Sequence, residues 1–400
     1  MLPDGWKSGK LADQLDHIID YRGTSVPKAK SGIPLITARN VRKGFLDLST
    51  TEYIDPNAEK EWMSRGYPHA GDILFTTEAP LGNIAKFPEH GKFCIGQRVV
   101  ALRTKKHVLT SDFLLYQLLS DKGQDLIDER SSGSTAKGIK TKELKKISIL
   151  IPPLPEQKKI AAILSTWDRA IEGTEKLLAN SQQQKKALMQ QLLTGKKRLP
   201  GFTGEWEKVS LEKTGKIVSG GTPDTTVPAY WDGDVLWLTP TDVTSLRGKY
   251  VDDTKRKITQ TGIKDSSTIL LPVGSLLVCT RATIGYMAIA KKPITTNQGF
   301  KNIVFNKLFL PEFVYYFLCT QKHEIQRLAS GSTFAEISKK DFGKIHISAP
   351  LLPEQKAIAT VLTTADEEIT ALESDLARLR QEKKALMQQL LTGKRRVTVD

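Results

Sequence analysis

Apolar residues recur with a 4-3-4-3 spacing in two long segments of the chain, residues 156–194 and 354–392. Prolines precede each segment, and Gly195 and Gly393 follow them, as is typical of the two ends of a helix. A 3.5-residue period sustained over this length is typical of a coiled coil. The pattern predicts two helices of 39 residues, each roughly 58 Å long at about 1.5 Å per residue.

The residues at this spacing form the expected coiled-coil seam of each helix. In the first helix the seam consists of Ile160, Leu164, Trp167, Ile171, Thr174, Leu178, Ser181, Lys185, Leu188 and Leu192. In the second helix it consists of Ile358, Leu362, Ala365, Ile369, Leu372, Leu376, Leu379, Lys383, Leu386 and Leu390. The lysines at the same place in both seams, Lys185 and Lys383, either fix the register of the helices or are inherited from one duplication.

Both helices belong to a repeat that covers the chain. Residues 185–196 recur without change as 383–394, and the sequence Leu-Pro-Glu-Gln-Lys at 154–158 recurs at 352–356, both at an offset of 198. The repeat is circular, because residues 2–6 supply the Leu-Pro and Trp that follow the first helix and are missing after the second. We therefore expect an internal two-fold axis, two termini that lie close in space, and helices that pair antiparallel. A coiled coil between two chains is the alternative.

The segments before the helices have a different pattern. Short apolar runs, such as residues 99–102 and 235–238, are broken by turn residues, which predicts twisted sheets with loops. One helix is expected near the end of each segment, at 111–124 and 311–326. The fold class is therefore α+β, with a mixed domain at 1–153, a helix at 154–198, a second mixed domain at 199–351 and a second helix at 352–400.

The composition of the chain also indicates which kind of partner the protein binds. Hydrophobic residues make up 39% of the chain, enough for a core in each mixed domain. The net charge of +15, from 59 Lys and Arg against 44 Asp and Glu, favours a polyanionic partner such as double-stranded DNA; a basic protein without such a partner is the alternative. Three widely spaced cysteines form no disulfide framework, and no apolar run reaches membrane length. We expect a cytoplasmic protein with no membrane association and no signal peptide.

The motifs of common catalytic and cofactor sites are absent from the sequence. No CxxC pair or ligand-spaced histidine cluster indicates a metal site, and no glycine-rich phosphate loop follows a strand. Glu-x-Lys triples at 143–145 and 382–384 are expected by chance in a chain this rich in both residues. We therefore expect no catalytic residue, no metal and no cofactor in this chain.

The duplicated helical sequences, followed by Arg-Leu-Pro-Gly-Phe at 198–202 and a tryptophan, resemble the specificity subunit of type I restriction–modification enzymes. The resemblance covers the whole chain. It implies that the mixed domains are target-recognition domains, each of which reads one half of a split, asymmetric DNA site. It also implies that the helices set the spacing of the halves and dock methylation subunits, two in number, and restriction subunits that translocate DNA. S-adenosylmethionine, ATP and Mg²⁺ would then bind to those partner subunits.

Polar residues beside glycine, at matching places of the two repeats, are the expected DNA contacts. They are Thr24 with Thr222, Arg39 and Asn40 with Thr241 and Asp242, Thr77 and Glu78 with Thr280 and Arg281, Gln97 and Arg98 with Gln298, and Ser134 and Thr135 with Ser332 and Thr333. Lys137 and Lys301 are expected to contact phosphates. The alternative for each residue is a solvated loop position or a local turn cap.

Two other functions are compatible with parts of this pattern. A stand-alone nuclease is opposed by the missing metal motifs, and DNA cleavage with Mg²⁺ alone would favour it. A coiled-coil scaffold that binds only proteins is opposed by the charge and by the polar loop pairs.

Overall fold

The computed structural model describes residues 2–21, 26–133, 137–329 and 335–399. The chain divides into two compact units: unit 1 comprises Met1–Glu175 with Asp375–Asp400, and unit 2 comprises Lys176–Ser374. The division passes through both long helices, so that each unit contains one mixed domain and a segment of each helix.

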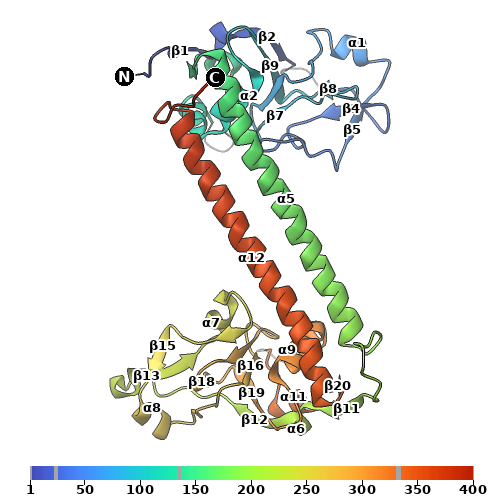
Figure 1. The fold of residues 1–400 in the computed structure, drawn as a ribbon, viewed down its shortest axis with the longest axis vertical. Coiled ribbons are helices and arrows are strands. Elements are labelled where there is room, and N and C mark those ends of the chain that lie inside the picture. The colour runs from blue at the N-terminus through green and yellow to red at the C-terminus, as the bar shows by residue number, and fades with distance from the viewer. Residues whose placement is uncertain (1, 22–25, 134–136, 330–334, 400) are drawn as a thin grey trace. The chain divides into compact units, whose positions relative to one another are not determined.

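Unit 1 contains two four-stranded sheets and a two-stranded ribbon (Figure 1). The first sheet is antiparallel, in the order β2 (Leu15–Asp20), β9 (Val99–Thr104), β6 (Ile73–Thr76) and β7 (Ile84–Lys86). The second has the order β3 (Lys28–Ala29), β5 (Glu52–Ile54), β4 (Ile33–Ile36) and β8 (Cys94–Ile95), with β4 and β8 parallel. The ribbon pairs β1 (Lys7–Lys10) with β10 (Ser148–Ile151).

Short helices complete unit 1. They are η1 (Leu11–Gln14), α1 (Glu59–Trp62), α2 (Ser111–Leu119), α3 (Asp121–Glu129) and α4 (Thr141–Leu144). The helix expected at 111–124 is therefore wrong in extent, because Ser120 interrupts it with an extended backbone, φ −64° and ψ 155°. The Ser120 hydroxyl accepts a hydrogen bond from the Gly123 backbone N–H at 3.1 Å and so begins a second helix.

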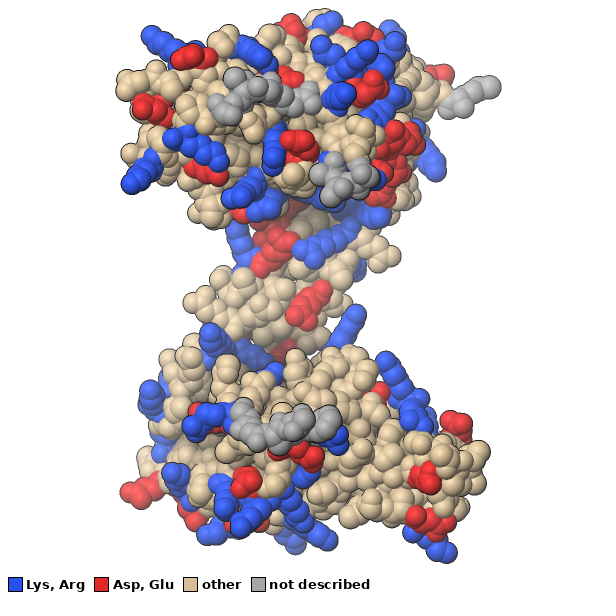
Figure 2. Space-filling model, turned by 180° about the vertical axis from the view of Figure 1, so that it is seen from behind, with Lys and Arg blue, Asp and Glu red and all other residues tan. Residues whose placement is uncertain are grey.

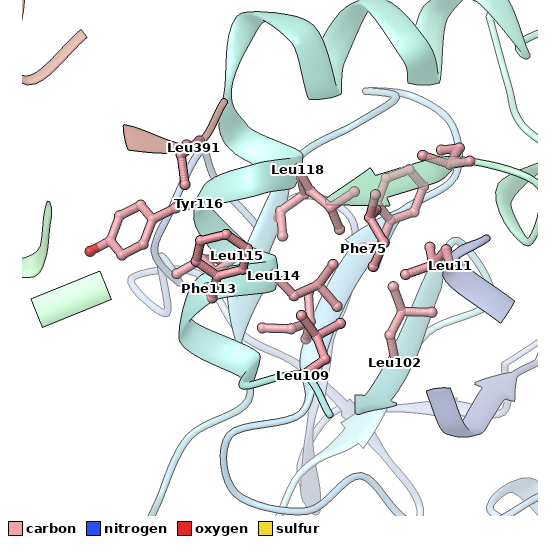
Figure 3. Packing of buried hydrophobic residues seen from close by; sticks show 14 of the residues in the cluster. Leu11, Phe75, Leu102, Leu109, Phe113, Leu114, Leu115, Tyr116, Leu118 and Leu391 are labelled. Carbon is pink, nitrogen blue, oxygen red and sulfur yellow. The ribbon is translucent and has the colours of Figure 1, made fainter. Parts of the chain in front are cut away.

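The main core of unit 1 lies between α2 and the first sheet. Phe113, Leu114 and Leu118 of α2 pack with Phe75 and Leu102 of the sheet, all less than 2% exposed (Figure 3). Every position of that α2 stretch from Phe113 to Leu118 is buried. The continuous apolar run of this helix is explained by its burial on more than one side.

Unit 2 repeats this plan with a longer sheet. The five-stranded sheet has the order β12 (Gly215–Ser219), β19 (Phe300–Phe305), β16 (Leu276–Cys279), β17 (Met287–Ala290) and β14 (Tyr250–Val251). The three-stranded sheet has the order β15 (Arg256–Ile258), β13 (Trp231–Leu238) and β18 (Ile294–Thr296), and β11 (Glu207–Ser210) pairs with β20 (His346–Ala349). The mixed α and β composition expected for both domains is confirmed.

Unit 2 also contains short helices. They are α6 (Leu211–Thr214), η2 (Pro228–Tyr230), α7 (Pro240–Ser245), α8 (Gln260–Lys264), α9 (Pro311–Thr320), α10 (Lys322–Leu328) and α11 (Lys339–Gly343). The single helix expected at 311–326 is again two helices, because the chain leaves α-helical geometry at Gln321, with φ −97° and ψ 10°.

The two long helices are confirmed: α5 spans Leu154–Leu192 and α12 spans Leu352–Leu390, 39 residues each. Each begins and ends two residues earlier than the apolar spacing predicts. Gly195 and Gly393 follow them with φ of 69° and 72°, the left-handed conformation that commonly ends a helix. Every position of the two expected seams is buried or partly buried.

Inside each unit the segments of α5 and α12 run antiparallel. In unit 1, Glu156 pairs with Arg396, Asp168 with Lys383 and Glu175 with Arg380. The residue number of the partner falls as the residue number on α5 rises, which is the order expected of antiparallel helices. In unit 2 the same order links Ser181 to Glu368, Lys185 to Asp366 and Arg198 to Glu354.

Each seam lysine pairs with one aspartate of the facing helix. Lys383 contacts Asp168, which also accepts a hydrogen bond from the Tyr116 hydroxyl at 2.6 Å. Lys185 contacts Asp366, which accepts a hydrogen bond from the Tyr316 hydroxyl. A charged seam residue with a specific partner disfavours any other register, because a slipped pair would leave both charges partly buried and unpaired. The contacts favour the register interpretation of the lysines.

The Leu-Pro-Glu-Gln-Lys repeat has the same structural role in both units. The Gln157 amide accepts from the Thr110 backbone N–H at 2.8 Å and donates to the Val108 and Pro152 carbonyls. Gln355 makes the equivalent contacts, with the Leu310 N–H at 2.9 Å and the carbonyls of Leu308 and Pro350. Each glutamine therefore ties the start of a long helix to the loop before α2 or α9.

The preceding glutamate of this repeat joins the chain ends within unit 1. Glu156 is 5% exposed and accepts hydrogen bonds from the Trp6 indole N–H at 3.1 Å and from Arg396 at 2.9 Å. Arg396 also donates to the Asp4 carbonyl at 3.1 Å. The expected closeness of the two termini is confirmed.

We expect the substitution Asp366→Ala to lower the stability of the protein more than Asp375→Ala. The first leaves Lys185 and Lys249 without their carboxylate, whereas Asp375 is 57% exposed and bonded to Arg378 alone. The loss should lie below the roughly 3–5 kcal/mol of a fully buried pair and above the roughly 1 kcal/mol of an exposed one. Urea unfolding followed by circular dichroism measures it, and equal midpoints for the two variants would contradict the assigned role of the pair.

The same carboxylate gives the stability a pH dependence. Burial raises the pKa of Asp366, but hydrogen bonds from Lys185 and Tyr316 and the charges of Lys185 and Lys249 outweigh it, so the pKa lies below its ordinary value of 3.8. A lowered folded-state pKa stabilises the protein above pH 3.8, and this contribution is lost as pH falls through the folded-state value. Thermal melts between about pH 6 and pH 3 should fall less steeply for Asp366→Ala than for the wild type.

Candidate nucleic-acid interface

Three backbone segments meet at the same place in each unit, and we call this place the loop junction. In unit 1 it comprises residues 77–82 after β6, 96–98 before β9, and 137–139; in unit 2 it comprises 280–285, 297–299 and 335–337. The Thr77 N–H donates to the Arg98 carbonyl at 3.0 Å, and the Ile139 N–H donates to the Thr77 carbonyl at 2.9 Å. The corresponding bonds in unit 2 join Thr280 to Gly299 at 2.8 Å and Ile337 to Thr280 at 3.0 Å.

The first segment of both loop junctions has positive φ angles at two matched positions. Ala79 and Ala282 adopt positive φ angles of 45° and 63°, and Gly82 and Gly285 follow with 79° and 82°. A left-handed alanine costs roughly 1–2 kcal/mol, and such residues concentrate at functional sites, where the surrounding structure holds them in place. The shared conformation indicates that the shape of this loop serves a function in each unit.

The loop junction of unit 1 borders a depression of about 370 Å³. Three of the expected DNA contacts line it together: Arg39, Gln97 and Arg98. Arg39 and Arg98 are exposed, and the Arg98 guanidinium pairs with Glu78, with Nε and Oε1 3.0 Å apart. The second sheet positions Arg39, since β4 pairs with β8 just before the 96–98 turn. The structure thus places these residues side by side although Gln97 comes 58 positions after Arg39 in the sequence.

Unit 2 brings together a different set at its loop junction. The Thr222 hydroxyl donates to the side-chain carbonyl of Gln298, which is exposed. Thr241 is exposed in the first turn of α7, and Arg281 is partly buried on the loop that contains Ala282. Pro240 Cγ lies 4.0 Å from the position that a Cβ on Gly299 would occupy, which places α7 beside the turn.

Asn40 and Asp242 are among the expected DNA contacts, but in the structure both side chains are buried in local hydrogen bonds. Asn40 is 2% exposed, and its oxygen accepts from the Thr37 N–H and hydroxyl at 2.9 Å. Asp242 is 5% exposed and accepts from the Thr239 N–H at 2.9 Å and hydroxyl at 2.6 Å. Each residue fixes the same turn in its unit, which is the turn-cap alternative.

Burial also removes three other expected contacts from the surface. Thr77 and Thr280 are at most 1% exposed, so their contribution to the loop junction is through the backbone. Lys301 is 6% exposed and pairs with Glu336 at 3.1 Å, so the phosphate contact expected of it is not supported. Lys137 is exposed and pairs with Asp128 at 2.6 Å. Five other expected contacts, Thr24, Ser134, Thr135, Ser332 and Thr333, lie outside the described residues.

Sequence reasoning missed three polar residues of the depression in unit 1, Lys28, Thr37 and Glu52, of which Lys28 and Glu52 form an ion pair at 2.8 Å. All three line it with Arg39 and Arg98. Lys28 lies on β3, which is paired through β5 with β4. None of the three has a glycine neighbour or a marked counterpart in the second repeat, so only the strand pairing reveals them.

The surface around these places is basic but not uniform. Lys and Arg side chains are spread over both units on the face drawn in Figure 2, interspersed with Asp and Glu. Among the described residues, no group of three His, Cys, Asp or Glu side chains is arranged to hold a metal ion. Within the same residues, no helix combines the length and the apolar character needed to cross a lipid bilayer. The arrangement supplies hydrogen-bond donors, acceptors and positive charge for a polar, anionic ligand.

Comparison with protein families matches both halves of this chain to one model, described as type I restriction modification DNA specificity domain, over residues 22–180 and 203–379. Two relatives come from Methanocaldococcus jannaschii. The putative type I restriction enzyme MjaX specificity subunit is 29% identical over 99% of this chain and 95% of its own length. The type I restriction enzyme MjaIX specificity subunit is 36% identical over 41% of this chain and 38% of its own length.

Two solved structures share the fold. The S subunit of a type I restriction–modification system from M. genitalium has a TM-score of 0.64 at 15% identity and is covered over 98% of each chain. A chain from a study of complex assembly and conformational transition of a type I R-M system has a TM-score of 0.59 at 19% identity, over 99% of this chain and all of that one. This chain has two DNA specificity domains in tandem, and it belongs to the family of type I restriction–modification specificity subunits.

We expect Asn40→Ala to destabilise unit 1 while its neighbour substitution Arg39→Ala does not. Asn40 loses bonds to Thr37 and to the carbonyls of Asp47 and Thr50, and each buried group left without a partner costs about 1–3 kcal/mol. Arg39 is exposed, so its removal should change stability by less than about 0.5 kcal/mol. Chemical denaturation of the two variants makes the comparison, and equal midpoints would contradict the structural role of Asn40.

Proposed function

We propose that this chain is the DNA sequence-recognition component of a type I restriction–modification complex and binds a bipartite, asymmetric site. One observation carries the proposal: both units build the same loop junction but present different side chains there. Arg39 corresponds to Thr241, Glu78 to Arg281, and Arg98 to Gly299. A common scaffold with different polar groups at its edge suits two readers of different base sequences.

The long helices would act as a spacer between the two mixed domains. The antiparallel contacts inside each unit support one coiled coil with pseudo-two-fold symmetry over the whole chain. In particular, the pairs Asp168–Lys383 and Asp366–Lys185 are related by the offset of 198. A symmetric pair of helices would fix the distance between the two half-sites in the manner of dimeric DNA readers.

Partner subunits would supply the chemistry that this sequence lacks. Large parts of α5 and α12 are exposed, including Leu177 at 57%, and these faces would dock two methylation subunits and the restriction subunits. S-adenosylmethionine, ATP and Mg²⁺ would bind to those subunits. The chain itself would be non-catalytic, and cleavage of DNA by the purified chain with Mg²⁺ alone would contradict this part of the proposal.

Deletion of the gene should abolish adenine methylation at one split motif in the genome, two short half-sites around a fixed unspecified spacer. Single-molecule sequencing of genomic DNA from the parent, the deletion strain and a complemented strain measures this directly. Complementation should restore the same motif. An unchanged methylation pattern in the deletion strain would contradict the proposed function.

A further inference from the structure

Three backbone positions of the loop junction carry the same three residue types in both units, but in a different order. The positions are the second residue of the first loop, the end of the turn before the central strand, and the middle of the third segment. Unit 1 has Glu78, Arg98 and Gly138 there; unit 2 has Arg281, Gly299 and Glu336. Antiparallel bridges of Glu78 with Gly138 and of Arg281 with Glu336 establish that the positions correspond.

Each set therefore contains one arginine, one glutamate and one glycine, and the glycine lies against the first loop of its unit. A Cβ added to Gly138 would lie 3.4 Å from the Glu78 Cβ, and one added to Gly299 would lie 3.6 Å from the Arg281 Cβ. The arginine thus lies on the turn in unit 1 and on the first loop in unit 2. These two positions are adjacent within each unit. The Arg98 backbone is fixed by the bond from Thr77, and its guanidinium is fixed by Glu78.

We propose that this arginine reads a guanine in each half of the DNA site, Arg98 in unit 1 and Arg281 in unit 2, which rests on the proposed function. The guanine edge in the major groove offers two neutral acceptors that match the two prongs of a guanidinium. A carboxylate beside the arginine would repel a phosphate, whereas it leaves binding to a neutral base edge intact and holds the guanidinium in one orientation. The pairing of Arg98 with Glu78 therefore favours a base contact over a phosphate contact in unit 1, and the backbone bridge between Arg281 and Glu336 extends the assignment to unit 2.

The glutamate acts as a positioning residue in this arrangement. Glu78 and Arg98 are about half exposed, with side-chain exposures of 48% and 49%, so the pair is accessible from solvent while it is formed. In unit 2 the glutamate on the third segment, Glu336, pairs with the buried Lys301, and its backbone is bridged to that of Arg281. The two units thus place an arginine and a glutamate at the loop junction through different residues, which a comparison of equivalent positions alone would miss.

The test uses the full chain, recovered from its own cells with the subunits that copurify, and a fully randomised duplex DNA library. Sequencing of the retained DNA should give a split motif with a guanine in each half. Arg98→Ala and Arg98→Lys should both reduce the preference for guanine at one position of one half by roughly ten- to hundredfold, because lysine lacks the two-pronged donor. Arg281→Ala should do the same in the other half only.

Other outcomes separate the two proposals. If the wild type enriches no split motif, the proposed function fails; if it enriches one that Arg98→Ala leaves unchanged, or weakens equally for all sequences, the guanine assignment alone is overturned. Arg327→Ala is the matched control, an exposed arginine of α10 that is also bonded to a carboxylate, and it should leave the motif unchanged. Glu78→Gln should relax the same base as Arg98→Ala with the same unfolding midpoint as the wild type. A shifted midpoint with an intact motif would overturn its positioning role.

Discussion

The pairing of α5 with α12 is the constraint on which the rest of the structure depends. Neither helix packs along its whole length against one mixed domain, because the compact units divide both helices. Leucines supply half of the seam positions, but leucine contacts tolerate many registers. The ion pairs Asp168–Lys383 and Asp366–Lys185 remove that freedom, and the tyrosines on α2 and α9 connect each pair to its mixed domain. One charged contact in each unit therefore joins the register of the helices to the position of the mixed domain on them.

The mixed domains show how one scaffold holds two surfaces. Backbone hydrogen bonds, left-handed alanines and buried turn caps are the same in both units, and they belong to Thr77, Ala79 and Asn40 in one and to Thr280, Ala282 and Asp242 in the other. The exposed side chains around them differ. Substitutions that would destabilise the fold are thus those at the positions shared by both units. The exposed residues that would contact a ligand can change with little effect on the stability of the fold.

The sequence predicts the long helices well because a 3.5-residue period over 39 positions is a strong, local signal. It fails to predict the breaks at Ser120 and Gln321, because no proline marks either position and only the backbone geometry shows the interruption. At the loop junction, matching polar positions indicate the right segments. They do not separate Asn40, which faces inward, from Arg39, which faces outward, because both are polar residues of one turn. That difference depends on the contacts of Asn40 with residues 37, 47 and 50.

The contact of Glu156 with Arg396 has a consequence for the synthesis of the chain. Unit 2 is one continuous segment, Lys176–Ser374, and all of its residues have been added before residues 375–400 are made. Unit 1 lacks its segment of α12 until those residues follow, even though its mixed domain emerges first. The second mixed domain is thus the first to acquire its complete helical support. A ribosome that stops before residue 375 leaves the carboxylates of Glu156 and Asp168 without their basic partners Arg396 and Lys383.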